Sequence, residues 1–408
     1  MLFRFSLYGF LKNQRYFEPF LVLFFLDQSL SFTQIGLLVA VRELTANLLE
    51  IPSGVWADLY GRRKAMIASF LAYILSFLTF AAGTTFLHFS GAMMLYACGD
   101  AFRTGTHKAI IFSWLRAEGR LEEKIQIYGH TRSWSKLGSA LSIVIATGVM
   151  IFTGQYRWMF YLTIVPYVLG VVNFLGYPAL LDQTPSQAQS DSGLSQHLKL
   201  TWRRLKKSAP LRRLVLESAT FEGTFKAARD YLQPITRQAA LGAPLLLGIN
   251  EKTREPLLIG VVYLVLFGLA AWASRNSYRV AERWGGEEKG VRLVWWGTVV
   301  LYAALVPILR SGLMVPAIVI FILLNLMQNL FRPMHVSRFD DHADEEIGAT
   351  VMSIESQAKG VTAMIMAPAL GWAVDAATGP ASSGLWPVGA VGAFLALATV
   401  ISGRGSRS

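Results

Sequence analysis

Charged side chains are scarce in this sequence. Asp, Glu, Lys and Arg make up 16% of its 408 residues, whereas a soluble domain of this length carries about a quarter. Hydrophobic residues account for 53%, and the mean hydropathy is +0.42. This balance excludes a chain of ordinary soluble domains and indicates that lipid is the solvent for most of the surface.

Cysteine is also nearly absent. Cys98 is the single cysteine, so an intramolecular disulfide is excluded. No cluster of metal-ligand residues, no Gly-Lys-Ser/Thr phosphate loop and no Ser-His-Asp set is recognisable, so we expect no metal, no cofactor and no enzymatic activity. No signal-peptide cleavage site follows the first apolar run, which we expect to remain as a membrane span.

Long apolar runs are plentiful instead. A helix of about 20 residues crosses the hydrocarbon core, and the runs therefore predict an all-α polytopic membrane protein with about twelve transmembrane helices. We expect spans near residues 5–26, 33–55, 65–84, 90–114, 132–153, 158–180, 211–239, 256–280, 290–310, 313–335, 346–369 and 384–402.

The spans fall into two sets of six. We expect an N-terminal six-helix bundle over 1–180, a cytoplasmic linker over 181–210 and a C-terminal six-helix bundle over 211–408. Residues 183–193 are polar and rich in Ser and Gln, which is typical of a flexible linker. Residues 194–207 place apolar side chains at helical spacing among basic ones, and this favours an amphipathic surface helix; a simple positively charged linker is the alternative.

The net charge of +12 is unevenly distributed. Lys and Arg concentrate in the loops around 62–64, 116–124 and 199–213, whereas the loops at 85–89 and 376–383 have none. Because basic loops stay in the cytoplasm, we expect both termini there, in a multi-pass protein of the inner or plasma membrane. The positive charge thus points to the lipid bilayer as the partner and away from nucleic acid.

One loop carries a specific motif, Gly54-Val-Trp-Ala-Asp58-Leu-Tyr-Gly61-Arg62-Arg63. Gly54 would allow a neighbouring helix to approach closely, and Asp58 could pair with a basic group or a helix N-terminus. Gly61 permits a tight turn, and the two arginines hold the loop in the cytoplasm. An ordinary positively charged turn is the alternative interpretation.

The spacing of this motif resembles the cytoplasmic loop signature of the major facilitator superfamily, and Ala281, Glu282 and Gly285 form a weaker echo in the second half. The resemblance implies two six-helix bundles that rock around a site at mid-depth, usually in a monomer. It also implies that the loop formed by Gly54, Asp58, Gly61, Arg62 and Arg63 acts as a conformational latch.

In the fold so implied, spans 1, 4, 7 and 10 line the central cavity, and polar side chains recur on those four spans. Ionisable groups inside a membrane are expensive and generally mark functional pathways. We predict that the substrate is bound by Lys12, Arg15, Arg103, His107, Lys226, Arg229, Gln328 and Asn329.

Arginine forks suit carboxylate or phosphate groups, and a carboxylate removed from water is easier to protonate. We predict Glu18, Asp100 and Glu222 as proton-coupling residues. Structural salt bridges within the bundle, for example between Asp100 and Arg103, are the alternative role. For His107, a hydrogen-bonding role in the helix bundle is the simpler alternative.

We therefore expect a secondary active transporter of a small polar or charged solute that works by alternating access with protons. Basic groups outnumber acidic ones inside the first six spans, which favours an anionic or zwitterionic solute. A multidrug–proton antiporter is an alternative, but span 5 lacks the Gly-Pro pair typical of that subgroup. A non-transporting receptor or assembly protein is another alternative, and a lipid-processing enzyme is disfavoured because the charges lie at mid-depth.

Overall fold

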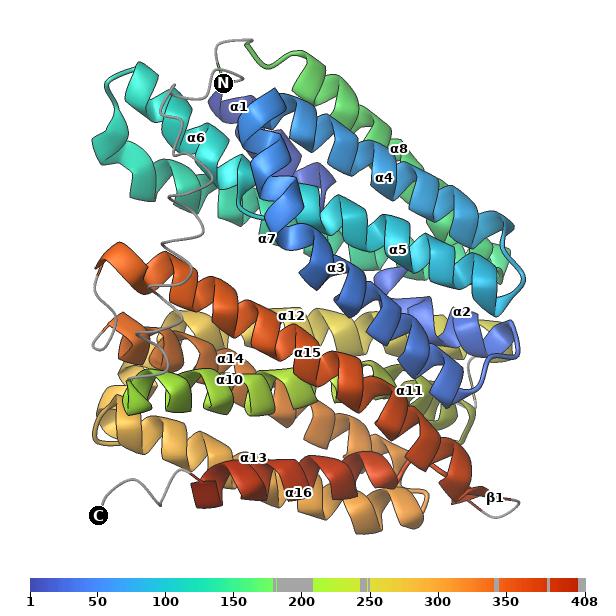
Figure 1. The fold of residues 1–408 in the computed structure, drawn as a ribbon. Coiled ribbons are helices and arrows are strands. Elements are labelled where there is room, and N and C mark those ends of the chain that lie inside the picture. The colour runs from blue at the N-terminus through green and yellow to red at the C-terminus, as the bar shows by residue number, and fades with distance from the viewer. Residues whose placement is uncertain are drawn as a thin grey trace. The chain divides into compact units, whose positions relative to one another are not determined.

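The computed structural model describes residues 1–178, 181, 208–242, 248, 250–340, 345–379 and 382–402. Helices account for most of them, and a short antiparallel hairpin is formed by β1 (Thr378–Gly379) and β2 (Ser382–Ser383) (Figure 1). Most of the predicted linker, including its amphipathic helix, lies outside the described residues.

The chain divides into two compact units. The first comprises Met1–Leu30 and Val41–Gln187, and the second comprises Ser31–Ala40 and Ala188–Ser408. Helix α3 (Phe32–Tyr60) begins in the second unit and continues in the first.

The first unit contains α1 (Leu2–Leu11), η1 (Glu18–Phe20), α2 (Leu21–Asp27), α4 (Arg62–Ala82), α5 (Phe86–Arg103), α6 (Thr106–Ala117), η2 (Leu121–Glu123), α7 (Lys124–Thr153) and α8 (Arg157–Leu175). The second contains α10 (Ala209–Ala228), η4 (Arg229–Tyr231), α11 (Leu232–Gly242), α12 (Glu251–Arg283), α13 (Glu287–Arg310), α14 (Met314–Asp340), α15 (Glu345–Ala377) and α16 (Pro387–Ser402).

Seven helices of the described chain are long and apolar enough to cross a membrane: α4, α7, α8, α12, α13, α14 and α15. Three further spans each consist of two helices with a break between them, namely α1 with α2, α5 with α6, and α10 with α11. Together with α3 and α16 these make twelve segments, and the predicted all-α membrane fold is confirmed.

The breaks differ from the continuous helices that we expected. Span 1 is non-helical over residues 12–17. Pro19 contributes to the later part of this break, because its ring would clash with the Arg15 carbonyl in a continuous helix and it has no amide hydrogen. Span 4 breaks at Gly105, whose φ of +78° favours glycine. Span 7 tightens into the 3-10 turn η4 shortly before Pro234.

Close packing within the first unit positions the break of span 1. Helix α1 packs on α7, and α4 packs on both α5 and α8 (Figure 1). A Cβ atom on Gly9 would lie 2.8 Å from the Thr131 carbonyl oxygen, and one on Gly138 would lie 2.6 Å from that of Phe10. These glycines therefore allow α1 and α7 to approach backbone to backbone.

Candidate substrate site

The breaks in spans 1 and 4 place three of the predicted residues around one space. Lys12 follows the last residue of α1, Arg103 ends α5, and His107 lies in the first turn of α6. Broken helices at mid-depth commonly form the substrate sites of transporters, because their ends expose backbone groups there.

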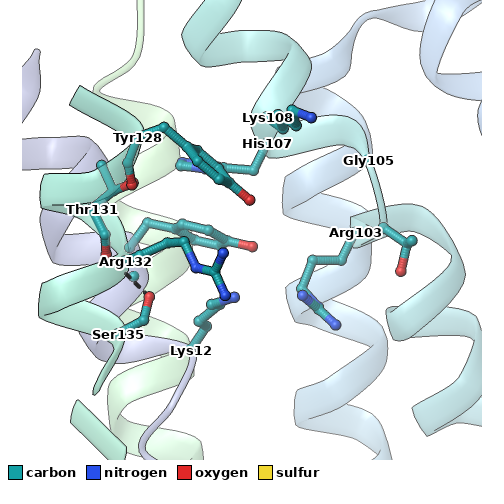
Figure 2. A pocket seen from close by; sticks show the side chains of 12 residues that line it. Lys12, Arg103, Gly105, His107, Lys108, Tyr128, Thr131, Arg132 and Ser135 are labelled. Atoms are coloured by element: carbon teal, nitrogen blue, oxygen red, sulfur yellow. Dashed lines mark hydrogen bonds between the residues drawn. The ribbon is translucent and has the colours of Figure 1, made fainter. Parts of the chain in front are cut away.

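These residues line a cavity of about 320 Å³ in the first unit, which lies within the usual size range of small-molecule sites. Figure 2 shows Lys12 and Arg132 on one side of the cavity and Arg103 on the other. The full lining comprises Tyr8, Gly9, Lys12, Arg103, Thr104, Gly105, His107, Lys108, Tyr128, Thr131, Arg132 and Ser135.

The cavity is strongly basic. Four of its lining residues are Lys or Arg, and none is Asp or Glu. The Lys12 ammonium lies 5.5 Å from the centre of the Tyr8 ring, and that of Lys108 lies 5.4 Å from the centre of the Phe112 ring. Within the described part of the chain, Lys12, Lys108 and Arg132 have no salt-bridge partner, so the cavity carries uncompensated positive charge.

Arg103 is the exception, because it binds Asp100. Its Nη2 donates to Asp100 Oδ1 at 2.8 Å, and its Nε donates to the Tyr73 hydroxyl at 3.0 Å. The Tyr73 hydroxyl in turn donates to Asp100 at 2.5 Å. The predicted binding and coupling residues of span 4 thus form one hydrogen-bonded group at the edge of the cavity.

Two predicted residues of span 1 lie outside the lining. Arg15 is 4.0 Å from Glu18 and 5.9 Å from the centre of the Tyr96 ring. The Glu18 side chain is 45% exposed. Because the helix is broken, Lys12, Arg15 and Glu18, which are three residues apart, do not share one helix face.

His107 has aromatic neighbours. Its ring stacks on Tyr8 at a centroid distance of 3.7 Å, and its Nε2 lies 3.4 Å from the Tyr177 hydroxyl. The residue is buried while still contributing to the cavity wall. Its packing thus agrees with a hydrogen-bonding role, and substrate contact remains a prediction.

In the second unit, Glu222 belongs to a cluster of two acids and two bases. Its carboxylate lies 3.2 Å from Arg332 Nη1 and 3.1 Å from Lys359 Nζ. The fully buried Glu355 binds the same two bases, with 3.2 Å to Lys359, and also accepts a hydrogen bond from Ser218. The cluster joins α10, α14 and α15 and is balanced in charge.

The remaining predicted residues of the second unit make local contacts. Arg229 lies 3.4 Å from Asp230, and Lys226 occupies the last turn of α10. The Asn329 amide donates to the Asn325 carbonyl at 2.8 Å and approaches Gln328 Oε1 at 3.4 Å. Their part in substrate binding stays a prediction.

The basic residues of the loop motif contact neighbouring segments. Gly61 is the N-cap of α4 and has a φ of +106°. Arg62 lies 3.5 Å from Asp58 and donates to Ser113 at 3.0 Å, and Arg63 donates to the Tyr177 carbonyl at 3.0 Å. A Cβ on Gly54 would meet no described atom within 4 Å, so the close helix contact that we expected there is absent from this part of the structure.

Several residues of the cavity and of the cluster around Glu222 were not among the predicted site residues. Tyr73 binds both Asp100 and Arg103, and Glu355 and Arg332 complete the cluster around Glu222. The hydroxyl groups of Thr131 and Ser135 line the cavity. Arg332 and Glu355 could have been identified from the sequence, because they are charged residues within predicted spans. Residues with hydroxyl groups in apolar runs form no distinctive sequence pattern.

Known proteins share this architecture. The nucleoside transporter NupG superimposes with a TM-score of 0.76 at 12% identity, covering 98% of this chain and 97% of that one. A D-xylose-proton symporter gives a TM-score of 0.68 at 13% identity, covering 98% and 96%. At such identities the likeness establishes the fold alone.

Sequence comparisons agree. An uncharacterized MFS-type transporter of Bacillus subtilis (strain 168), YxaM, is 33% identical over 90 residues, which are 22% of this chain and 23% of that protein. The family model of the Major Facilitator Superfamily matches residues 10–367. With a match over most of its length and the fold described above, the chain belongs to the Major Facilitator Superfamily.

Proposed function

We propose that this chain is a secondary active transporter that carries a small anionic or zwitterionic solute by alternating access, coupled to protons. The observation that supports this most is the basic cavity at the breaks of spans 1 and 4. An organic anion would find several cationic partners there, and arginine and lysine are the side chains that bind carboxylate and phosphate groups.

The contact between Asp100 and Arg103 supports proton coupling. A substrate anion that binds Arg103 would compete with Asp100 for the same guanidinium. Asp100 is partly buried, and a carboxylate in such a site that loses its cation is left uncompensated and takes up a proton more readily. Substrate and proton would then bind together, and Glu18 and Glu222 are the other candidate proton carriers.

We further propose that the protein acts as a monomer in the inner or plasma membrane with both termini in the cytoplasm. The distribution of Lys and Arg between loops supports this orientation. In this orientation the loop with Asp58 and Gly61 faces the cytoplasm, where it would latch one of the two access states.

The first test is a thermal-shift screen of the detergent-purified protein with organic anions, amino acids, sugars, nucleosides and cationic drugs at two pH values. A ligand at a hundredfold over its Kd should stabilise the fold by about 2.7 kcal/mol. Stabilisation by cationic drugs alone would favour a multidrug antiporter. No stabilisation of demonstrably folded protein would favour a non-transporting receptor.

The second test is uptake of the identified solute into proteoliposomes. Asp100→Asn should make uptake independent of the proton gradient, because the amide cannot exchange a proton, while Arg103→Gln should raise the substrate Kd. Arg15→Gln tests the remaining arginine of span 1 in the same assay. Unchanged pH dependence in Asp100→Asn would remove Asp100 from the coupling mechanism.

A further inference from the structure

The basic side chains reach the cavity from four different elements. Lys12 comes from the break of span 1, Arg103 from the end of α5, Lys108 from α6 and Arg132 from α7. Lys12 and Arg103 are partly buried, whereas Lys108 and Arg132 are exposed. A planar carboxylate can be bound by a single guanidinium group. Cationic side chains on several sides are better suited to a phosphoryl group, which has three acceptor oxygens.

The net charge of the cavity also favours a ligand with more than one negative charge. Asp100 offsets one of the four cations through Arg103, and no described carboxylate pairs with the other three. A monocarboxylate would leave two of these charges uncompensated, and a dianion would leave one. The ammonium group of a zwitterion would meet only like charges, since no acidic residue lines the cavity.

The N-terminus of α6 adds to this environment. Gly105 precedes the helix and provides no side-chain cap, so the first amide groups of this 12-residue helix keep their hydrogens free of a capping side chain. Gly105, His107 and Lys108 all belong to the cavity wall. Helix N-termini favour anions, and phosphate groups in particular.

The cavity also offers room for an organic part. The rings of Tyr8 and Tyr128 line the cavity, as do the hydroxyl groups of Thr131 and Ser135 (Figure 2). A small polar molecule could therefore place its anionic group among the cations and its remainder against the rings and hydroxyls.

We infer that the cavity binds a dianionic phosphoryl group, either inorganic phosphate or the phosphate of a small monoester. This inference rests on the proposed transport function and narrows its substrate class. Lys12 is the most informative residue for testing it, because it is partly buried in the cavity and forms no salt bridge within the described chain.

The test is calorimetric titration of the purified full chain with inorganic phosphate, methyl phosphate, succinate, acetate and glycine. We expect one of the phosphoryl probes to bind at least tenfold more tightly than succinate and still more tightly than acetate or glycine. Tighter binding of methyl phosphate would identify a monoester as the cargo, and tighter binding of phosphate would identify the free anion.

Lys12→Gln should weaken binding of the phosphoryl probe about tenfold to a hundredfold, the range for one hydrogen bond to a charged group. Lys12→Arg should retain most of the affinity. The control is Lys124→Gln, since Lys124 lies exposed at the start of α7 and outside the cavity lining. Because Lys12 has no described anionic partner, the melting temperature of unliganded Lys12→Gln should not fall, which separates a binding role from a structural one.

Three results would overturn the inference in distinguishable ways. Tighter binding of succinate, acetate or glycine than of either phosphoryl probe would refute the phosphoryl class and leave the transport proposal intact. Phosphoryl binding that is unaffected by Lys12→Gln would place the site elsewhere. If no probe binds and Arg103→Gln leaves uptake of every solute unchanged, both proposals fail.

Discussion

Arg157 is the single basic residue between the predicted spans 132–153 and 158–180. In the proposed orientation this loop lies outside the cell, where basic residues are usually avoided. Its guanidinium donates to the carbonyl groups of Ala81 at 3.3 Å and Gly83 at 3.2 Å, and to Gln28 Oε1 at 3.0 Å. The carbonyl groups at the end of a helix lack partners within the helix. Arg157 thus provides hydrogen bonds to carbonyl groups at the C-terminal end of α4. This structural role explains why a basic residue occurs in a loop where such residues are usually avoided.

The charged residues of the two units differ in how they are compensated. Glu222, Glu355, Arg332 and Lys359 neutralise one another within hydrogen-bonding distance. In the cavity of the first unit, Asp100 compensates only Arg103. We interpret the balanced cluster as a tie among α10, α14 and α15, in which Glu222 is also a proposed proton carrier, and the unbalanced cavity as the proposed binding site.

The balanced cluster predicts a large loss of stability in Glu355→Gln. This variant keeps the shape of the side chain but leaves Arg332 and Lys359 with Glu222 as their only carboxylate in the cluster. Breaking a buried ion pair usually costs about 3–5 kcal/mol, and we expect the lower end because Arg332 is 31% exposed. Thermal unfolding in detergent measures the change.

The matched control is Glu123→Gln. Glu123 also binds an arginine, Arg120, with both side chains about 40% exposed, at 39% and 41%. Exposed pairs contribute little, so this variant should melt like the wild type. Equal melting temperatures for Glu355→Gln and Glu123→Gln would show that the cluster does not hold the helices together.

At the scale of elements, the breaks in spans 1 and 4 determine where the cavity forms. If span 1 were one continuous helix, Lys12 would be a residue within it. If span 4 were continuous, the first amide groups of α6 would donate hydrogen bonds to carbonyl groups of the preceding turn. Pro19 and Gly105 prevent this, one by clashing with the preceding turn and the other by adopting a positive φ. Both residues are visible in the sequence, although neither alone predicts where the helix restarts.

The contact between α1 and α7 predicts opposite effects for two glycine substitutions on α7. Gly138→Ala adds a Cβ 2.6 Å from the Phe10 carbonyl oxygen, so the helices must separate, at about 1–3 kcal/mol. Because both helices line the cavity, ligand binding should weaken as well. Thermal unfolding and the calorimetric titration measure the two effects.

Gly148→Ala is the control on the same helix. A Cβ there meets no described atom within 4 Å, and alanine favours helix over glycine by up to about 1 kcal/mol. This variant should be as stable as the wild type or slightly more so. If Gly138→Ala were equally benign, the close approach of α1 and α7 would not be required for folding.

At the scale of the whole molecule, the proposed orientation can be tested with single cysteines. Cys98→Ser gives a cysteine-free background, because Cys98 is the sole cysteine. A membrane-impermeant thiol reagent should label Gln155→Cys from outside intact cells, and Lys124→Cys only after permeabilisation, since both positions are exposed. The reverse labelling pattern would contradict the orientation based on loop charge.

Much of the architecture was predictable from the sequence. The all-α membrane fold and the superfamily were confirmed, with seven of the expected spans formed by single helices long and apolar enough to cross a membrane in the described chain, and family membership identifies a membrane transport protein and not an enzyme. Part of the candidate site was predictable too, since Lys12, Arg103 and His107 line one cavity. The contribution of Arg132 from α7 was not, because span 5 is not among the four spans expected to line the site.

The sequence by itself determined the membrane fold, because the free energy of transferring apolar side chains into lipid adds up along the chain. An apolar run of about 20 residues can bury its side chains and pair its backbone groups in few structures other than a membrane-spanning helix. Only the tertiary structure decided which charges are paired. Glu222 meets Arg332 across 110 residues of chain, while Lys12 meets no described carboxylate at all. Electrostatic energy depends on the distance between groups on different helices, and that distance is set by helix packing.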